Sequence, residues 1–417
     1  AMKLAQLGPV FEFRFLGARY VVAAGSDAVA ELNDESRFCK HVGPDIEALR
    51  LLGGDGLFTA YNDEPNWQKA HDVLMPAFSQ QSMRRYHAIM FDVADELTAR
   101  WDERQIVDVS ADATRATLET IGRCAAGHPF GAFDSEEPHP FVEHMVAGLK
   151  GADRVGVLRQ TFLPRWFARR AERRVLGHAA AMHRIADEIV AERLREGPGR
   201  HDDLLELMLQ SDLEPANIRY QLINFLVAGH ETTSGALSFA LYFLAQHPEI
   251  ADRARAEIAE VWGEQQRPDF ELIAKLRYVR RVFDEALRLH PTVPGYYRAA
   301  RDDTLLAGVH PMRKGDWVLA LTMTLHRDPR WGEDPDAFDP DRFAPENVKA
   351  RPAGLYKPFG TGPRSCIGRQ FALHEAVLLL AVLLRRYELI PDPDYELQVA
   401  ERLTLMPKDF HLTLRRR

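Results

Sequence analysis

The stretch FGTGPRSCIG, residues 359–368, places one cysteine among three glycines, a proline and an arginine. A cysteine that served only core packing would lie in an apolar run. Cys366 lies instead in a glycine-rich turn, and the helical pattern QFALHEAVLL, residues 370–379, follows directly. Because a helix N-terminus lowers the pKa of a nearby thiol, the stretch predicts a thiolate that binds or attacks a partner.

The composition bounds the class of protein. The chain has 417 residues, of which 46% are hydrophobic, enough for one large domain or two ordinary ones. The net charge of −8 disfavours nucleic-acid binding. Three cysteines, Cys39, Cys124 and Cys366, are too few and odd for a disulfide framework, which indicates a reducing compartment. No apolar run reaches the roughly 20 residues of a membrane span, so we expect a soluble, cytoplasmic protein.

Helical patterns dominate the chain, and no repeat or linker divides it. The longest pattern begins near Pro215 and ends at His247–Pro248, and its roughly 32 residues would span about 48 Å. Further helices are expected at 65 onward, 87–101, 165–196 and 249–290. Strands are expected in a hairpin over 11–23 broken at Leu16–Gly17, at 317–321, and in a C-terminal hairpin of 403–405 with 411–414. We therefore expect one mainly α domain over residues 1–417 with a minor β region.

Two motif matches fail on inspection. Gly360-Thr361-Gly362 is no dinucleotide loop, because the third glycine falls only at Gly368 and no strand leads into it. The stretch HETTS, residues 230–234, begins like a zinc-protease helix, but its second histidine is replaced by Ser234.

The middle of the long helix carries an unusual polar group, AGHETTSG at residues 228–235. Gly229 inside a helix costs about 1 kcal/mol relative to alanine. Thr232 can donate to the carbonyl of Ala228 and loosen the helix, so that this hydroxyl and the Glu231 carboxylate bind water and relay protons. A simple helix kink with polar surface residues explains the same pattern.

Two further patterns involve arginine. Glu285 and Arg288 are three residues apart, on one face of a helix, where most such pairs are solvated and stabilise by less than about 1 kcal/mol. Arg342 lies in FDPDRF, residues 338–343, between two aromatic residues.

Together these four patterns resemble the motifs of the cytochrome P450 family, in the family's order. They are AGxETT at 228–233, ExxR at 285–288, PxRF at 340–343 and FxxGxRxCxG at 359–368. The resemblance covers essentially the whole chain and is closest to the heme domains of self-sufficient bacterial fatty-acid hydroxylases, which are fused to a diflavin reductase. Matching stretches include DESRF at 34–38 and GDGLFTA at 54–60. The implied fold is the P450 triangular prism, with the long central helix crossing the distal heme face.

The resemblance implies heme b as cofactor and assigns residues to it. Cys366 would be the proximal thiolate ligand of the iron, and Phe359 would pack beside its sulfur. The heme propionates would be held by Lys40, Trp67, His71, Arg364 and, by similarity to the broader family, Arg298.

The resemblance also assigns catalytic and structural residues. Thr232 and Glu231 would form the distal acid–alcohol pair that delivers protons during dioxygen reduction. Glu285, Arg288 and Arg342 would form a buried ion-pair network beneath the heme, with a structural role.

An apolar substrate pocket is implied as well. Its walls would be Phe58, Leu226, Val227, Ala228, Val293 and Leu403. The relatives anchor a fatty carboxylate on the early hairpin at positions that fall on Ala18 and Val22 here, which leaves Arg14 and Arg19–Tyr20 as nearby substitutes.

The function implied is a heme-thiolate monooxygenase that inserts one oxygen atom from O2 into a C–H or C=C bond of an apolar or amphipathic substrate, such as a fatty acid. A tailoring oxidase of a neutral natural product is the alternative substrate class. A peroxide-driven hydroxylase is disfavoured by Glu231–Thr232, and a non-catalytic heme sensor or electron-transfer protein would not need Thr232. No flavin or iron–sulfur segment is present, so a ferredoxin, a flavodoxin or a diflavin reductase would donate electrons to this bacterial-type domain.

Overall fold

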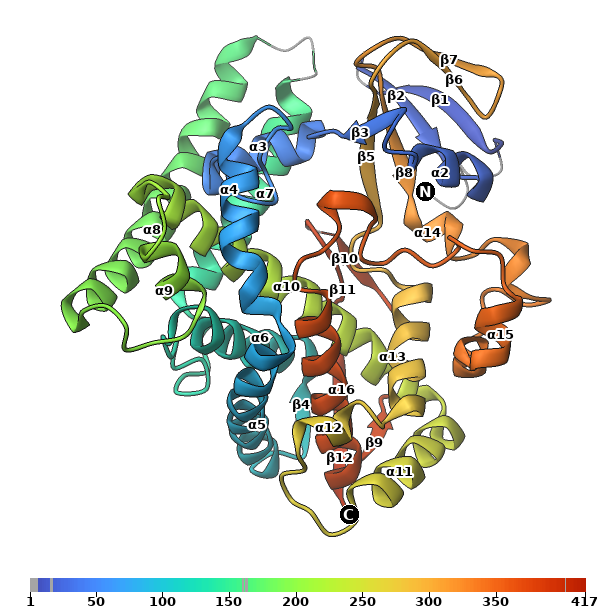
Figure 1. The fold of residues 1–417 in the computed structure, drawn as a ribbon. Coiled ribbons are helices and arrows are strands. Elements are labelled where there is room, and N and C mark those ends of the chain that lie inside the picture. The colour runs from blue at the N-terminus through green and yellow to red at the C-terminus, as the bar shows by residue number, and fades with distance from the viewer. Residues whose placement is uncertain (1–6, 16–17, 160, 162–163, 402) are drawn as a thin grey trace.

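A computed structural model describes residues 7–15, 18–159, 161, 164–401 and 403–417. Most of the chain forms a helical body, and a smaller sheet region that contains the first strands lies at the upper right of Figure 1. The predicted class, mainly α with a minor β region, is confirmed. Among the described residues, no helix combines the length and the apolar character needed to cross a membrane.

The helices cover most of the sequence. The α-helices are α2 (Ser26–Leu32), α3 (Pro44–Gly53), α4 (Pro65–Leu74), α5 (Gln80–Asp102), α6 (Val109–Ala126), α7 (Pro140–Arg159), α8 (Arg165–Glu196), α9 (Leu204–Leu209), α10 (Pro215–Gln246), α11 (Pro248–Trp262), α12 (Phe270–Ile273), α13 (Arg277–Leu289), α14 (Thr322–Leu325), α15 (Pro345–Ala350) and α16 (Arg369–Arg386). Short 3-10 turns are η1 (Met75–Phe78), η2 (Pro329–Trp331), η3 (Pro340–Phe343) and η4 (Gly362–Arg364).

The strands are short. They are β1 (Val10–Phe15), β2 (Ala18–Ala23), β3 (Phe38–Lys40), β4 (Ile106–Asp108), β5 (Gly295–Ala300), β6 (Thr304–Leu306), β7 (His310–Met312), β8 (Trp317–Leu321), β9 (Tyr387–Pro391), β10 (Val399–Glu401), β11 (Leu405–Pro407) and β12 (His411–Arg416).

The predicted long helix is α10, and its ends follow from two prolines. Pro215 occupies its first turn, where a missing N–H costs nothing, and the chain leaves the helix at His247 before Pro248. The helix packs against α6, α13 and α16, so it runs through the centre of the helical body (Figure 1). Most of its side chains are buried on all sides, as expected for a central helix.

The main sheet has the strand order β1-β2-β8-β5-β3. β1 and β2 form the predicted hairpin, with Phe13 opposite Tyr20 and their rings stacked 5.2 Å apart. Its turn at Leu16–Gly17 lies outside the described residues. β2 then pairs in parallel with β8, which brings the start of the chain next to a strand about 300 residues later.

The predicted C-terminal hairpin is wrong. β11 pairs with β10 instead, and β12 lies between β4 and β9. The alternating pattern of β12, with Leu412 and Leu414 buried, identified a strand. Such a pattern does not specify the partner, and here the strand pairs with two segments that are distant in sequence.

Candidate functional site

The loop that carries Cys366 is shaped by its glycines. Gly360 and Gly362 have φ angles of +68° and +70°, a left-handed conformation that side chains other than glycine rarely adopt. At Gly362 an added Cβ would also lie 2.2 Å from Oε1 of Glu35. The Cys366 N–H donates to the Phe359 carbonyl at 2.9 Å and closes the loop just before α16 begins. The sequence therefore fixes the position of the thiol with backbone geometry.

Cys366 is exposed as a residue, yet burial raises the pKa of its thiol. The Gly368 N–H and the charge of Arg369 oppose this shift without overcoming it. The expected lowering of the thiol pKa is therefore wrong, because loss of solvent outweighs the helix N-terminus. The residue is nevertheless accessible, and a metal ion that binds there would itself deprotonate the thiol.

A single aromatic ring links this loop to α10. Phe78 lies 3.8 Å from the place of a Cβ at Gly368, and its ring stacks on Phe225 of α10 with centroids 6.0 Å apart. The Phe359 ring lies 5.6 Å from the Arg369 guanidinium. The cysteine loop and the central helix thus bound the same part of the interior.

The middle of α10 has one accessible window. Between residues 221 and 241, every residue is buried except Val227, Ala228, Gly229 and Thr232. Thr232 Oγ1 donates to the Ala228 carbonyl at 2.8 Å, which is the predicted contact, while Glu231 is buried. The window lies on one helical face and exposes a hydroxyl within the protein.

The expected opening of the helix at this window is wrong, because α10 remains α-helical from Pro215 to Gln246. Gly229 has a different reason to be there. A Cβ at this position would lie 2.8 Å from Ile121 of α6, so the glycine permits close approach of two helices.

Five of the six predicted pocket residues present surface. Phe58 is 37% exposed and Val293 40% exposed, and Val227, Ala228 and Leu403 are at least partly accessible. Leu226 does not fit the prediction, because it is fully buried in the core. It precedes Ala228 by two residues, or about 200° around the helix, and so points to the opposite face.

Two partly buried cations lie together on one side of the site. Arg364 donates to the carbonyls of Ala60 (3.3 Å) and Tyr61 (3.0 Å), and its guanidinium lies 4.0 Å from the Trp67 ring centroid. Lys40 Nζ donates to the Phe58 carbonyl at 2.5 Å. Neither cation forms an ion pair with a carboxylate of the described residues. Burial lowers the pKa of Arg364 to about 10, and burial together with the Arg364 and Arg50 charges lowers the pKa of Lys40 to about 7.

This cation cluster, Lys40 and Arg364, has the chemistry of a carboxylate receptor. Cations removed from water are normally paired with carboxylates, and here the described residues supply carbonyl oxygens and aromatic faces instead. A cavity of about 380 Å³ beside the cluster is lined by Lys40, His41, Val42, Tyr61, Asn62 and Asp63. His71 lies one turn along α4 from Trp67, with the two rings stacked 5.0 Å apart. These residues fit the two propionates of a heme.

Arg298 differs from the other predicted propionate residues. Its guanidinium forms an ion pair with Glu35 at 2.8 Å and donates to the Leu32 carbonyl at 2.9 Å. Its charge is already balanced by the protein, so Arg298 is a weaker receptor for a carboxylate than Lys40 or Arg364.

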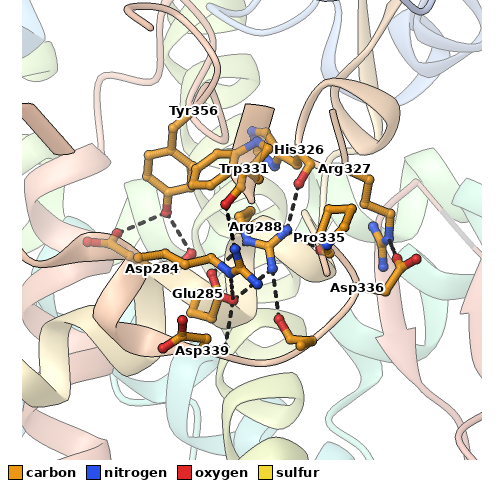
Figure 2. A network of polar contacts seen from close by, with 12 residues as sticks. Asp284, Glu285, Arg288, His326, Arg327, Trp331, Pro335, Asp336, Asp339 and Tyr356 are labelled. Carbon is orange, nitrogen blue, oxygen red and sulfur yellow. Dashed lines mark hydrogen bonds and ion pairs between the residues drawn. The ribbon is translucent and has the colours of Figure 1, made fainter. Parts of the chain in front are cut away.

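The predicted Glu285–Arg288 pair is part of an extensive polar network (Figure 2). Arg288 holds both carboxylate oxygens of Glu285 at 2.6 and 2.7 Å, and both side chains are fully buried. The remaining donors of Arg288 reach the carbonyls of His326, Pro335 and Ala337. Arg342 approaches Glu285 at 3.5 Å. The predicted surface alternative for the Glu285–Arg288 pair is therefore excluded, and the network ties α13 to the segment that precedes the cysteine loop.

Sequence reasoning missed one set of polar residues, Asn217, Gln221 and Asn224 on α10. All three are buried, and they hold the loop of residues 53–58. Their spacing of four and three residues within an apolar helix was the available signal.

Comparison with known proteins establishes the class. The family model described as Cytochrome P450 matches residues 2–414, and the chain belongs to the cytochrome P450 family. This family uses heme, and the Cys366 thiol together with the cation cluster fits that cofactor.

The chain is similar to heme-containing parts of longer proteins. It is 42% identical to a bifunctional cytochrome P450/NADPH–P450 reductase of Bacillus subtilis (strain 168), over 99% of this chain and 40% of that protein. It is 41% identical to a protein of the same description in Bacillus cereus, and 38% identical to a self-sufficient cytochrome P450 monooxygenase of Phanerodontia chrysosporium over 39% of that protein. The chain thus spans about two fifths of the length of these curated relatives, which come from both bacteria and fungi.

Proposed function

We propose that this chain is the heme domain of a monooxygenase, which inserts one atom of O2 into a C–H or C=C bond of an apolar or amphipathic molecule. The observation that carries the proposal is that Cys366 and Thr232 are both accessible within the protein, on two elements joined through Phe78. Heme bound through Cys366 would supply the activation of O2.

The chain's own contribution is the delivery of protons. The Thr232 hydroxyl donates to Ala228, which leaves its lone pairs free to accept a hydrogen bond from a water in the window. Glu231 is the adjacent buried carboxyl and would pass protons to that water. Thr232 therefore positions the water, and Glu231 exchanges its protons.

Other residues hold the cofactor and the fold. Lys40 and Arg364 would pair the propionates, with Trp67, His71 and Arg298 beside them, and Phe359 would pack near the sulfur. Glu285, Arg288 and Arg342 would keep the segment before the cysteine loop in place without touching the substrate.

The substrate pocket would be formed by Phe58, Val227, Ala228, Val293 and Leu403, which favours a long or ring-bearing apolar body. Arg14 and Arg19 face each other directly across the β1–β2 hairpin, and Glu12 pairs with Arg19 at 2.9 Å. Two cations with one carboxylate leave a positive charge to anchor a substrate carboxylate, so fatty-acid hydroxylation is our preferred reading. Oxidation of a neutral natural product is the competing one.

The proposal implies partners and a setting. O2 and an electron donor are required, and the reductase named in the relatives makes a fused or separate diflavin reductase the first choice before a ferredoxin or a flavodoxin. We propose that residues 1–417 form one domain of a cytoplasmic protein.

The test is to supply the heme-loaded chain with electrons from a separate reductase and with isotopically labelled O2. Medium- to long-chain fatty acids and neutral polycyclic compounds serve as candidate substrates. One labelled atom in the product, found by mass spectrometry, would support the proposal. Product formed only with added hydrogen peroxide would contradict it, and a heme spin-state shift with fatty acids that Arg19→Ala weakens would support the carboxylate anchor.

A further inference from the structure

The loop that carries Phe58 is attached to the central helix by three amide side chains. Asn217, Gln221 and Asn224 lie on one face of α10. Asn217 Nδ2 donates to Asp55 at 2.8 Å, and Gln221 Nε2 donates to Asn217 at 3.0 Å. Asn217 and Gln221 are thus joined by a hydrogen bond, and Asn224 lies one turn further along the same face and donates to the Tyr220 carbonyl at 2.7 Å. We call these three side chains the amide ladder.

The ladder binds the loop at two consecutive backbone N–H groups. The Leu57 N–H donates to Gln221 Oε1 at 2.9 Å, and the Phe58 N–H donates to Asn224 Oδ1 at 3.2 Å. Asn224 Nδ2 donates in turn to the Gly53 carbonyl at 3.0 Å. Gln221 is fully buried, so water cannot readily replace these bonds.

The glycines of GGDG, residues 53–56, allow the loop to lie directly on the ladder. A Cβ at Gly56 would be 2.1 Å from Asn224 Nδ2, and one at Gly53 would be 2.6 Å from the same atom. A Cβ at Gly54 would lie 2.4 Å from the Tyr220 ring of α10. Any larger residue would lift the loop away from the helix, so the glycines and the ladder act together.

The carbonyl side of the same loop is held by two cations. Lys40 Nζ donates to the Phe58 carbonyl at 2.5 Å, and Arg50 Nη1 donates to the Thr59 carbonyl at 2.8 Å. Arg50 is fixed by Glu64, which accepts both of its Nη groups. The backbone of Phe58 is thus held at its N–H and at its C=O, while the residue remains 37% exposed.

We infer that the amide ladder consists of positioning residues, which fix the Phe58 ring at the accessible interior and so decide how large apolar ligands approach the cofactor. This inference rests on the proposed heme site. A ring on a rigid backbone excludes ligands of the wrong shape, whereas a ring on a loose loop would move aside. Asn224 is the decisive member of the ladder, because its Oδ1 accepts the Phe58 N–H, whereas Gln221 accepts the Leu57 N–H and Asn217 bonds to Asp55.

The test compares two heme ligands, 4-phenylimidazole and imidazole, by titration of the Soret band of the heme-loaded chain. The ratio of their Kd values measures how much the phenyl group changes the affinity, and it cancels effects on the heme itself. Phe58→Ala should change this ratio by about threefold or more, and Asn224→Ala should change it in the same direction. The double variant should change it no more than Phe58→Ala does, because both substitutions act through one ring.

Asn66→Ala is the matched control. Asn66 donates to Asp55 of the same loop at 2.7 Å without contacting Phe58, so its ratio should stay at the parent value. An unchanged ratio in Asn224→Ala would overturn the inference, and so would additive effects in the double variant or an equal effect of Asn66→Ala. If Asn224→Ala does not fold, Asn224→Ser takes its place. Failure of the heme site itself would appear separately, as loss of imidazole binding in the parent chain.

Discussion

The Glu285–Arg288 network buries positive charge fully and the Lys40–Arg364 cluster buries it partly, and the two balance that charge differently. Arg288 is paired with a carboxylate and donates to three carbonyls, and both members of the pair are fully buried. Among the described residues, Lys40 and Arg364 contact carbonyl oxygens and aromatic rings but no carboxylate, and the pKa of each is lowered. A network in which the protein itself balances every charge stabilises the fold, whereas a cluster with unbalanced positive charge is suited to bind a negatively charged ligand.

The largest effect should come from breaking the completed network. Arg288→Ala leaves the Glu285 carboxylate buried without its partner, and we expect a loss of about 3–5 kcal/mol in the free energy of unfolding. Denaturant titration of the purified variant measures it. Arg253→Ala is the control, because Arg253 pairs with Asp341 at the surface and should change stability by less than about 1 kcal/mol. Equal effects of the two substitutions would remove the distinction between completed and surface pairs.

The incomplete cluster should respond in the opposite sense. Lys40→Met removes a partly buried cation that has no carboxylate partner among the described residues, so the heme-free chain should become more stable, while heme is released faster. Loss of a charge-assisted hydrogen bond to a propionate is worth about 1.5–3 kcal/mol, or roughly 10- to 100-fold in heme affinity. Transfer of heme to apomyoglobin measures the release. Unchanged release from both Lys40→Met and Arg364→Gln would show that the cluster does not serve the cofactor.

The completed network should also be sensitive to acid. His326 Nε2 accepts the Lys357 N–H at 2.9 Å, and burial and the Arg288 charge lower the His326 pKa from 6.5 to about 3. Below pH 6.5 the unfolded chain therefore binds a proton that the folded chain does not. The free energy of unfolding therefore decreases by about 1.4 kcal/mol for each unit by which the pH is lowered in this window.

His326→Gln keeps a hydrogen-bond acceptor and should reduce the slope of unfolding free energy against pH between 6.5 and about 4. Substitution of His411, which is exposed on β12, serves as the control. An identical slope in parent and His326→Gln would contradict a neutral buried imidazole.

The smallest effect concerns the distal window. Thr232→Ala should leave the fold and heme content unchanged, because the hydroxyl donates to the Ala228 carbonyl of its own helix. Product formed per electron should fall several-fold, with the remaining electrons lost to peroxide or water, since the positioned water is gone. Thr232→Ser should restore coupling. Thr233→Ala, a change at the neighbouring buried threonine, should have no such effect, and equal uncoupling by both would show a general helix defect.

Much of this architecture could be predicted from local signals. Pro215 and Pro248 fixed the ends of α10, because proline restricts both helix starts and helix ends. The glycine pattern around Cys366 indicated a constrained turn, and the φ angles of Gly360 and Gly362 agree. Structural features that depend on a few neighbouring residues can therefore be predicted from the local sequence.

Features that depend on distant segments could not be predicted. The two partners of β12 come from separate parts of the sequence, and the thiol pKa depends on how much protein surrounds Cys366. The sequence pattern indicated that Gly229 weakens the helix, whereas in the structure Ile121 of α6 lies so close that only a glycine fits there. In each case the deciding atoms belong to residues far along the chain, about which a local pattern carries no information.

The measurement that tests the central claim most directly is the spectrum of the reduced, carbon monoxide-bound protein in three cysteine variants. A thiolate ligand produces the strongly red-shifted Soret band that gives the family its name. Cys39→Ala and Cys124→Ala should keep this band, because Cys39 lies in β3 and Cys124 in the buried core of α6. Cys366→Ala should lose it, and a band that persists in Cys366→Ala would contradict the account.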